Sequence, residues 1–500
     1  MANNVFELLS AGEASAPAII EPAGPTITYA QLREQVAHLA GQLNALGIAR
    51  NDRVAIVLPN GPEAALSFLA VAACATAAPL NQAYREDEFR FYMDDLKAKA
   101  LITLPNDAPA AHAAAGNDVL RLALDGRLGG YTLLHDGAEV EPVTPTFGEA
   151  DDIALVLHTS GTTARPKIVP LKQRNLLVSS GNIRESLALT STDRCLNVMP
   201  LFHIHGLMAA LLASLSAGAS VVTSPGFDAF RFFGWLEETT PTWYTAVPTM
   251  HQLVLTRAGR QKETVERTKL RFIRSSSASL PPTVMAELEE TFGAPVIEAY
   301  GMTEASHQMA TNQLPPGQRK PGAVGLGAGV EVAIMDDAGT LLERGATGEV
   351  VIKGGNVTSG YENNPDANES AFSDGWFRTG DQGYQDPDGF LFLTGRLKEI
   401  INRGGEKVSP REVDEVLLQH PAVAQAVAFG VPHERLGEEV AAAVVLAEGA
   451  TADEKELREY ASKQLADFKT PKHIIILEDI PKGATGKVQR IGLAEKLGLG

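Results

Sequence analysis

Cysteine is scarce in this sequence, with only Cys74 and Cys195 among 500 residues. The two residues are far apart, and each lies in an apolar segment without a second ligand at a metal-binding spacing. A disulfide framework and a cysteine-based metal site are therefore both unexpected. So few cysteines suit a reducing compartment.

Basic charge and long apolar runs are also lacking. Lys and Arg number 43 against 61 Asp and Glu, which gives a formal net charge of -18, and no basic block offsets the excess. This balance argues against nucleic acid or an anionic membrane as a partner, so an anionic substrate would need a local pocket of positive charge. The most apolar segment, Phe68 to Leu80, is shorter than the ~20 residues that span a bilayer.

Neither end of the sequence carries a recognisable targeting signal. The start, "MANNVFELLS", lacks the basic residues and the apolar run of a signal peptide, and the final "KLGLG" is not a peroxisomal signal. We therefore expect a cytoplasmic protein. Nothing in the sequence indicates its oligomeric state.

The pattern along the chain predicts an α/β protein of several units, because ~100–200 residues usually make one domain. Helical and strand patterns alternate over 29–100 and again from 270 onward. Short strands with glycine turns over 322–394 predict a small antiparallel β subdomain. We expect an N-terminal domain over 1–394, a hinge at 395–398 and an α+β domain over 399–500.

The segment "HTSGTTARPK", His158 to Lys167, follows a short apolar strand pattern at 153–157. A loop at a strand end presents backbone N–H groups and hydroxyls, and a lysine adds positive charge. Phosphate is therefore the expected ligand of this loop. The segment is not a P-loop, because no second glycine precedes Lys167 and the Ser/Thr residues come before the lysine. By itself such a loop is more often a solvated turn.

Five further stretches follow this loop in order: "PLFHIHG" (200–206), "EAYGMTEASH" (298–307), "WFRTGD" (376–381), "GRLKEIINRGGEKVSP" (395–410) and "PKGATGKVQR" (481–490). With these six motifs the sequence resembles the adenylate-forming superfamily of acyl-CoA synthetases, adenylation domains and luciferases over nearly its whole length. The resemblance implies doubly wound α/β subdomains with a small β-barrel-like subdomain, followed by a small mobile α+β C-terminal domain.

The resemblance also implies the reaction and its co-substrates, which are ATP, Mg²⁺ and coenzyme A. A carboxylate oxygen attacks the α-phosphorus of ATP, pyrophosphate leaves, and the acyl-AMP then passes its acyl group to the CoA thiol with release of AMP. Because an anion approaches a polyanion, the site must supply positive charge and directed donors.

The resemblance assigns nucleotide contacts to Thr159, Ser160, Gly161, Thr162, Thr163, Lys167, Glu298, Ala299, Tyr300, Thr303, Asp381 and Arg396. The first loop would wrap the β- and γ-phosphates. Tyr300 would stack on adenine, Thr303 would donate to the α-phosphate, and Glu304 would hold Mg²⁺. Asp381 would take the ribose hydroxyls, with Arg396 as a second contact.

Lys487 resembles the catalytic lysine of the family, which bridges the acyl carboxylate and the α-phosphate. Lys398 resembles the hinge about which the C-terminal domain turns between the two half-reactions. Arg403, Gly404 and Gly405 could let pantetheine pass close to the backbone. No residue is identified as a base for the thiol.

The acid is the least constrained part of the prediction. Ser306 and His307 follow the T-E pair, where fatty-acyl and aryl relatives place small or apolar groups, and Arg274, Ser277 and His203 would make the pocket polar. An apolar acid would leave these groups unsatisfied, at ~1–3 kcal/mol each. The sequence is most similar to the oxalate-CoA ligase branch, so we expect oxalate, with His307 and Ser277 on its distal carboxylate.

His203, counted among the catalytic residues, would line or gate the acyl site. His203 and His205 as a metal pair are weakly supported, because no third ligand is evident. Other acids, namely malonate, an aryl acid or a medium-chain acid, stay open, as does an adenylation domain that serves a carrier protein. A nucleotide-binding regulator without turnover and a luciferase-like oxygenase are the remaining alternatives.

Overall fold

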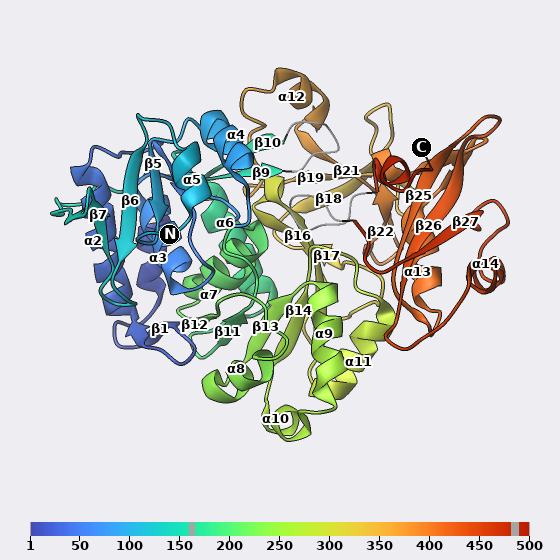
Figure 1. Ribbon diagram of the computed structural model, residues 1–500, viewed down its shortest axis with the longest axis horizontal. Coiled ribbons are helices and arrows are strands. Elements are labelled where there is room, and N and C mark those ends of the chain that lie inside the picture. The colour runs from blue at the N-terminus through green and yellow to red at the C-terminus, as the bar shows by residue number, and fades with distance from the viewer. Residues whose placement is uncertain (1, 160–165, 482–489, 500) are drawn as a thin grey trace. The chain divides into compact units, whose positions relative to one another are not determined.

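The computed structural model describes residues 2–159, 166–481 and 490–499. The chain divides into two compact units (Figure 1). The first contains residues 2–159, 166–332 and 352–377, and the second contains residues 333–351 and most of the chain from 378 onward. Each unit is described by itself below.

A nine-stranded sheet forms one half of the first unit, in the order β17-β16-β15-β14-β13-β11-β12-β1-β2. Its central strands are parallel: β15 (Val296–Met302), β14 (Phe272–Ser275), β13 (Trp243–Ala246), β11 (Arg194–Asn197), β12 (Ser220–Thr223) and β1 (Pro17–Ile20). The edges are antiparallel, with β2 (Thr26–Thr28) on one side and β16 (His307–Thr311) and β17 (Leu326–Gly327) on the other.

An eight-stranded sheet forms the other half, in the order β10-β9-β4-β3-β5-β6-β7-β8. Strands β3 (Arg53–Ile56), β4 (Thr76–Pro79), β5 (Ala100–Thr103) and β6 (Leu120–Asp125) are parallel, as is the pairing of β4 with β9 (Ile153–Thr159). The antiparallel members are β10 (Lys167–Lys172), β7 (Thr132–His135) and β8 (Ala138–Glu139). Two largely parallel sheets confirm the predicted doubly wound α/β class.

Local sequence signals explain where several helices begin and end. Helix α2 (Tyr29–Ala45) starts at Thr28, whose side chain forms a capping box with Gln31. Helix α11 (Pro282–Phe292) has proline in its first turn and ends at Gly293, which adopts φ +62°. The helix lies beside α9 (Pro248–Ala258) (Figure 1).

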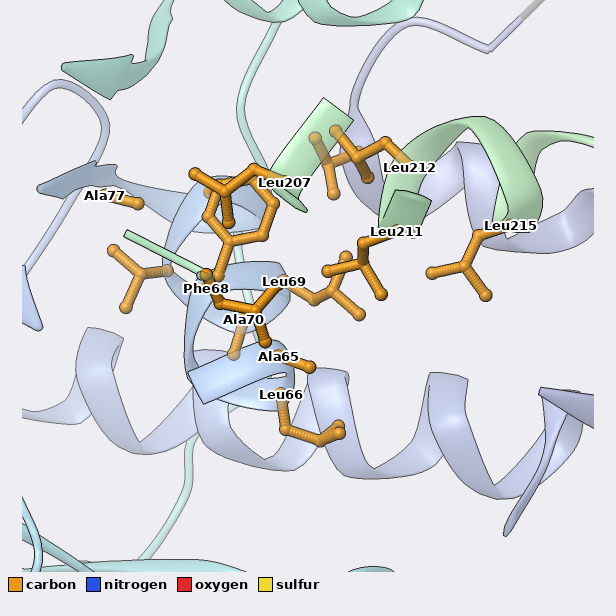
Figure 2. Packing of buried hydrophobic residues seen from close by; sticks show 14 of the residues in the cluster. Ala65, Leu66, Phe68, Leu69, Ala70, Ala77, Leu207, Leu211, Leu212 and Leu215 are labelled. Atoms are coloured by element: carbon orange, nitrogen blue, oxygen red, sulfur yellow. The ribbon is translucent and has the colours of Figure 1, made fainter. Parts of the chain in front are cut away.

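The largest apolar core of the first unit contains α3 (Pro62–Cys74) and a π-helix, η2 (His205–Leu212), that continues into α7 (Ala213–Ser216). Figure 2 shows Leu207 and Leu211 close to Phe68 and Leu69 of α3. A π-helix is uncommon and often marks a functional site. This one holds His205, its first residue, fully buried.

The second unit is built mainly from strands. Residues 333–351 and 378–396 contribute strands to a sheet of the order β18-β19-β21-β20, with β22 paired to β21; β20 itself belongs to the first unit. The members of this sheet are β18 (Glu331–Met335), β19 (Gly348–Lys353), β20 (Phe372–Ser373), β21 (Trp376–Gln385) and β22 (Leu391–Arg396). The predicted boundary at 395–398 stays a prediction.

The second sheet of this unit has the order β24-β23-β26-β25, with β27 on β26. Its strands are β23 (Ile401–Arg403), β24 (Glu406–Val408), β25 (Val423–His433), β26 (Gly437–Leu446) and β27 (His473–Leu477). The helices α13 (Pro410–Leu418), α14 (Glu454–Ser462) and α15 (Leu493–Lys496) accompany it. This is the small α+β arrangement that the sequence predicts. In the described part of the whole chain, no helix is long and apolar enough to cross a bilayer.

Candidate active site

The carboxyl ends of β13, β14 and β15 meet at one edge of the nine-stranded sheet, because these strands are parallel neighbours. Ligand crevices of open α/β sheets lie at such edges. Ser276 and Ser277 follow β14, and Thr303 and Glu304 follow β15. The antiparallel strand β16 then brings His307 back opposite Met302.

A connected group of polar side chains lies buried at this edge. His205 Nε2 is 2.6 Å from Thr245 Oγ1 and 3.3 Å from an Arg274 Nη atom, and His205 Nδ1 is 3.0 Å from Ser277 Oγ. The other Nη atom of Arg274 donates to Gln308 Oε1 at 3.1 Å. Side chains from four elements, η2, β13, β14 and β16, thus share one hydrogen-bonded cluster.

Arg274 is fully buried and, within the described ranges, makes no ion pair. Its Nε atom is buried without a hydrogen-bond partner. Burial lowers the pKa of Arg274 to about 9, so the guanidinium still carries its charge at neutral pH. An uncompensated buried charge costs several kcal/mol, and such a cost is commonly tolerated at functional sites. The charge gives this acidic protein a local positive region.

His307 lies against His205, with ring centroids 4.9 Å apart and an angle of 27° between the rings. Burial, followed by the nearby His307 and Arg274, holds the pKa of His205 well below its ordinary value. His203 joins the group through its Nδ1 atom, which accepts a hydrogen bond from the backbone N–H of His205 at 3.2 Å. The neutral His205 ring therefore lies next to a cationic side chain and to the imidazole of His307.

Backbone strain is concentrated at the same place. Ser277, Ser306 and His307 adopt φ values of +72°, +48° and +95°, which residues other than glycine seldom adopt. The turn at Ser306 is held by its hydroxyl, which donates to the Asn356 carbonyl at 2.9 Å, and by Ser179, which donates to the Ser306 carbonyl at 2.5 Å. Strain of about 1–3 kcal/mol per residue is typical of ligand-binding positions.

A further fully buried histidine, His251, makes stability depend on pH. Its Nδ1 atom is 3.1 Å from the Tyr244 hydroxyl, and burial lowers its pKa from 6.5 to about 3. Below pH 6.5 the unfolded chain binds a proton at His251 that the folded chain excludes. The contribution of His251 to the free energy of unfolding is therefore fully present above pH 6.5 and is lost as the pH falls. We expect the free energy of unfolding to fall by about 1.4 kcal/mol per pH unit from this residue.

Urea unfolding between about pH 5 and pH 7 measures this slope. In His251→Leu the slope should decrease by the contribution of one histidine, whereas the fully buried His205 still contributes. An unchanged slope in the variant would contradict the assignment of this pH dependence to His251.

Glu304 is the residue best suited to hold a divalent cation. Its side chain is buried, and the Tyr361 hydroxyl donates to Oε1 at 2.9 Å. Among residues 2–159, 166–481 and 490–499, no group of three His, Cys, Asp or Glu side chains could hold a metal ion alone. One oriented carboxylate fits Mg²⁺, which commonly takes its remaining ligands from phosphates and water. When bound, Mg²⁺ would neutralise phosphate charge.

Tyr361 also contacts the lysine of the first motif. Lys167 Nζ lies 4.3 Å from the centroid of the Tyr361 ring. Lys167 begins β10 and pairs with Thr159 at the end of β9, so both ends of the motif are fixed on neighbouring strands. Ser160, Gly161, Thr162 and Thr163, together with Lys487, lie outside the described residues.

The strand that carries the predicted adenine contacts is tied to its neighbour. Glu298 Oε1 accepts from the backbone N–H of Leu280 at 3.1 Å, and Ser276 Oγ donates to the Ala299 carbonyl at 2.8 Å. Tyr300 follows in β15 and is buried. Glu298 and Ala299 thus help to fix the edge of the site.

In the second unit, the predicted ribose contacts Asp381 and Arg396 lie together. They are cross-strand partners on β21 and β22, and Arg396 Nε is 3.1 Å from Asp381 Oδ1. Asp381 is buried, whereas half of the Arg396 side chain is exposed. The pair presents one carboxylate already oriented by a guanidinium.

The predicted hinge and pantetheine residues lie further along the same unit. Lys398 is exposed in a short 3₁₀ turn. Arg403 Nε is 2.5 Å from Glu439 Oε1, and Gly404 and Gly405 adopt φ values of +61° and +95° in the turn between β23 and β24. Such φ values favour glycine.

A buried ion pair anchors Arg490, three residues after Lys487. An Arg490 Nη atom lies 2.5 Å from Asp414 Oδ2, and its Nε lies 3.2 Å from Glu399 Oε2. Burial raises the pKa of Asp414 to about 6, and Arg490 opposes this shift. The sequence analysis missed this pair, although "GKVQR" contains the arginine.

The structure brings His203, Arg274, Ser277 and His307 together through contacts that all include His205, and their role in an acyl site stays a prediction. Sequence reasoning missed the structural role of His205 and the contributions of Thr245, Gln308 and Tyr361. His205 was visible in "PLFHIHG", but the hydrogen-bonding partners of its ring come from 40, 69 and 72 residues away.

Comparison with known proteins agrees with this geometry. The sequence matches the AMP-binding enzyme family over residues 7–362 and the C-terminal domain of AMP-binding enzymes over residues 412–487. A probable CoA ligase, CCL9, from Humulus lupulus is 50% identical over 480 residues, which cover 94% of this chain and 91% of the relative. An oxalate–CoA ligase from Arabidopsis thaliana is 49% identical over 93% of this chain and 92% of its own.

Solved structures show the same fold. ATP-bound MatB from Rhodopseudomonas palustris superposes with a TM-score of 0.89 at 32% identity and covers 99% of both chains. The motifs, the parallel sheet edge and these similarities lead to one conclusion: the chain belongs to the family of AMP-binding enzymes.

Proposed function

We propose that this acid–CoA ligase activates oxalate. One oxalate carboxylate oxygen attacks the α-phosphorus of ATP, pyrophosphate leaves, and oxalyl-AMP forms. The CoA thiol then loses its proton and attacks the acyl carbon, and AMP leaves with the oxygen that came from oxalate. The observation that carries the proposal is the buried Arg274, which makes no ion pair within the described residues and lies beside His205 in the polar cluster.

The chemistry of this cluster supports a small dianion. Ser277 and His307 would hold the distal carboxylate, and His203 would line the site near the reacting carboxylate. A monocarboxylic acid with an apolar tail would leave these donors without a partner, which costs about 1–3 kcal/mol for each unsatisfied group, and would gain nothing from the nearby positive charge of Arg274. The similarity to relatives named oxalate–CoA ligases supports the same acid.

In this proposal the nucleotide lies at the ends of β9 and β15. Residues 159–163 and Lys167 would bind the β- and γ-phosphates, and Thr303 would donate to the α-phosphate. Tyr300 would stack on adenine, and the carboxylate of Glu304 would hold Mg²⁺. Negative charge accumulates on the α-phosphoryl oxygens during attack, so each donor fixed there before reaction lowers the barrier.

The second unit would complete both half-reactions. Asp381 and Arg396 would bind ribose, and Lys487 would bridge the two reacting anions during adenylation. A turn about Lys398 would then bring Arg403, Gly404 and Gly405 to the pantetheine arm of CoA. The positive φ values of both glycines support a close approach of the backbone at that turn.

A cytoplasmic location belongs to the same proposal. Cys74 and Cys195 are both free and buried, and free thiols are usual in a reducing compartment.

Thioester formation across a panel of acids tests the proposed substrate. Purified protein would receive ATP, Mg²⁺ and CoA with oxalate, malonate, sulfoacetate, benzoate or octanoate, and each CoA product would be quantified by mass. We expect oxalate to have the highest kcat/KM of the panel, at least about 100-fold above that of benzoate or octanoate, because the donors and charge match a short dianion. A higher kcat/KM for benzoate or octanoate would contradict the proposal.

A further inference from the structure

The hydrogen bonds around His205 determine where its proton lies. Arginine has only donors, so the Arg274 Nη atom 3.3 Å from His205 Nε2 requires an unprotonated Nε2. Thr245 Oγ1, at 2.6 Å from the same nitrogen, then donates as well. A neutral imidazole with an acceptor at Nε2 carries its proton at Nδ1.

This proton position has a consequence for Ser277. Nδ1–H of His205 faces Ser277 Oγ at 3.0 Å and therefore donates to it. The Ser277 hydroxyl cannot donate back along that line, so its own proton must point elsewhere. His203 is oriented in a similar way, because its Nδ1 accepts from the His205 backbone and its proton, when neutral, lies on Nε2.

We infer that Arg274 and His205 are positioning residues that orient Ser277 as a hydrogen-bond donor toward the substrate and so select an acid whose distal group is a pure acceptor. The inference rests on the proposed function for the identity of that acid. Arg274, which the sequence places in the acyl pocket as one of its polar residues, acts through its contact with His205 and does not touch the acid. Carboxylate oxygens match such donors, whereas an amide NH₂ would face them donor to donor.

The proton position can be measured without any substrate. In protein labelled with ¹⁵N-histidine, long-range ¹H–¹⁵N correlation distinguishes the two neutral tautomers, and His205→Asn identifies the signals of His205. We expect wild-type His205 to be protonated at Nδ1 and Arg274→Met to show a mixture or the Nε2–H form. A wild-type Nε2–H tautomer would overturn the inference, whatever acid the enzyme uses.

Kinetics test whether Arg274 acts through Ser277. We expect Arg274→Met to raise the KM for oxalate about 10- to 100-fold, the range for a lost hydrogen bond to a charged group, with KM for ATP unchanged. In a Ser277→Ala background, the factor by which Arg274→Met raises the KM for oxalate should be at least about fivefold smaller. The reason is that no Ser277 hydroxyl is then left for Arg274 to orient through His205. Equal effects in both backgrounds would overturn the inference.

Two comparisons complete the test. Wild-type enzyme should discriminate against oxamate, which replaces one carboxylate oxygen of oxalate with NH₂, and Arg274→Met should reduce that discrimination. Discrimination unchanged by the substitution would contradict the role in selection. Thermal unfolding identifies any variant that does not fold. If Arg274→Met does not fold, the tautomer of His205 in the wild-type protein decides whether the inference holds. Failure of wild type to activate oxalate would instead refute the proposed function and leave the tautomer result intact.

Discussion

Replacing Lys487 by alanine is expected to slow acid-dependent pyrophosphate exchange about 10²–10³-fold, the usual cost of removing a donor aimed at developing charge. The adenylation step joins an oxalate oxygen to a phosphorus that carries negative oxygens. A cationic amine that reaches both anions offsets their repulsion most strongly as the bond forms. The affinity for ATP should change little, since in the proposed site other donors would hold the β- and γ-phosphates.

The thioester-forming step distinguishes this role from a general loss of folding. Lys487→Ala supplied with synthetic oxalyl-AMP and CoA should form oxalyl-CoA at nearly the wild-type rate, because that step needs no charge at the α-phosphate during attack. Lys455→Ala is a matched control, since Lys455 is highly exposed in the same unit and has only a weak 3.9 Å pair with Glu459. A Lys487→Ala variant that exchanges pyrophosphate at the wild-type rate would contradict the assignment.

Replacing His307 by alanine is expected to lower kcat/KM for oxalate at least about 100-fold while ATP still binds. His307 is buried against His205 at the end of the polar cluster, and the proposal places it on the distal carboxylate. Its removal would leave the buried distal carboxylate with fewer hydrogen-bond donors. The loss of binding free energy should be larger in this preorganised polar site than in an apolar pocket.

Backbone strain allows a sharper version of this test. His307 adopts φ +95°, a conformation that suits glycine. His307→Gly should therefore be at least as stable as His307→Ala, because relief of about 1–3 kcal/mol of strain offsets the greater flexibility of glycine. Both variants should lose oxalate activity equally, and exposed His473→Ala should lose none. Full oxalate activity in the glycine variant would show that the imidazole does not contact the acid.

Much of the fold follows from sequence signals that act locally. The loop after β14 and helix α11 were predictable, because a strand pattern, prolines in the first turn and Gly293 mark their ends. The pairing of Asp381 with Arg396 follows once the two motifs are placed on neighbouring antiparallel strands. These features depend on residues close in sequence or on one strand pairing.

The features that define the acid site could not be predicted in this way. Among the residues that the structure describes, Arg274 lacks an ion pair because the tertiary fold surrounds it with His205 and Gln308, which come from η2 and β16. The positive φ of Ser277 and His307 opposes local preference, since sequence patterns place glycine at such positions. The apolar run after His205 also reads as an ordinary α-helix, and only the packed structure shows the π-helix.

Isotope transfer from the acid to the nucleotide tests the central claim most directly. Oxalate labelled with ¹⁸O in every position would be incubated with the enzyme, ATP, Mg²⁺ and CoA, and the nucleotide products would be analysed by mass spectrometry. The account predicts AMP that carries a single ¹⁸O atom, formed in step with oxalyl-CoA, because the attacking carboxylate oxygen stays on the α-phosphorus. Unlabelled AMP, or ¹⁸O in inorganic phosphate together with ADP, would contradict it.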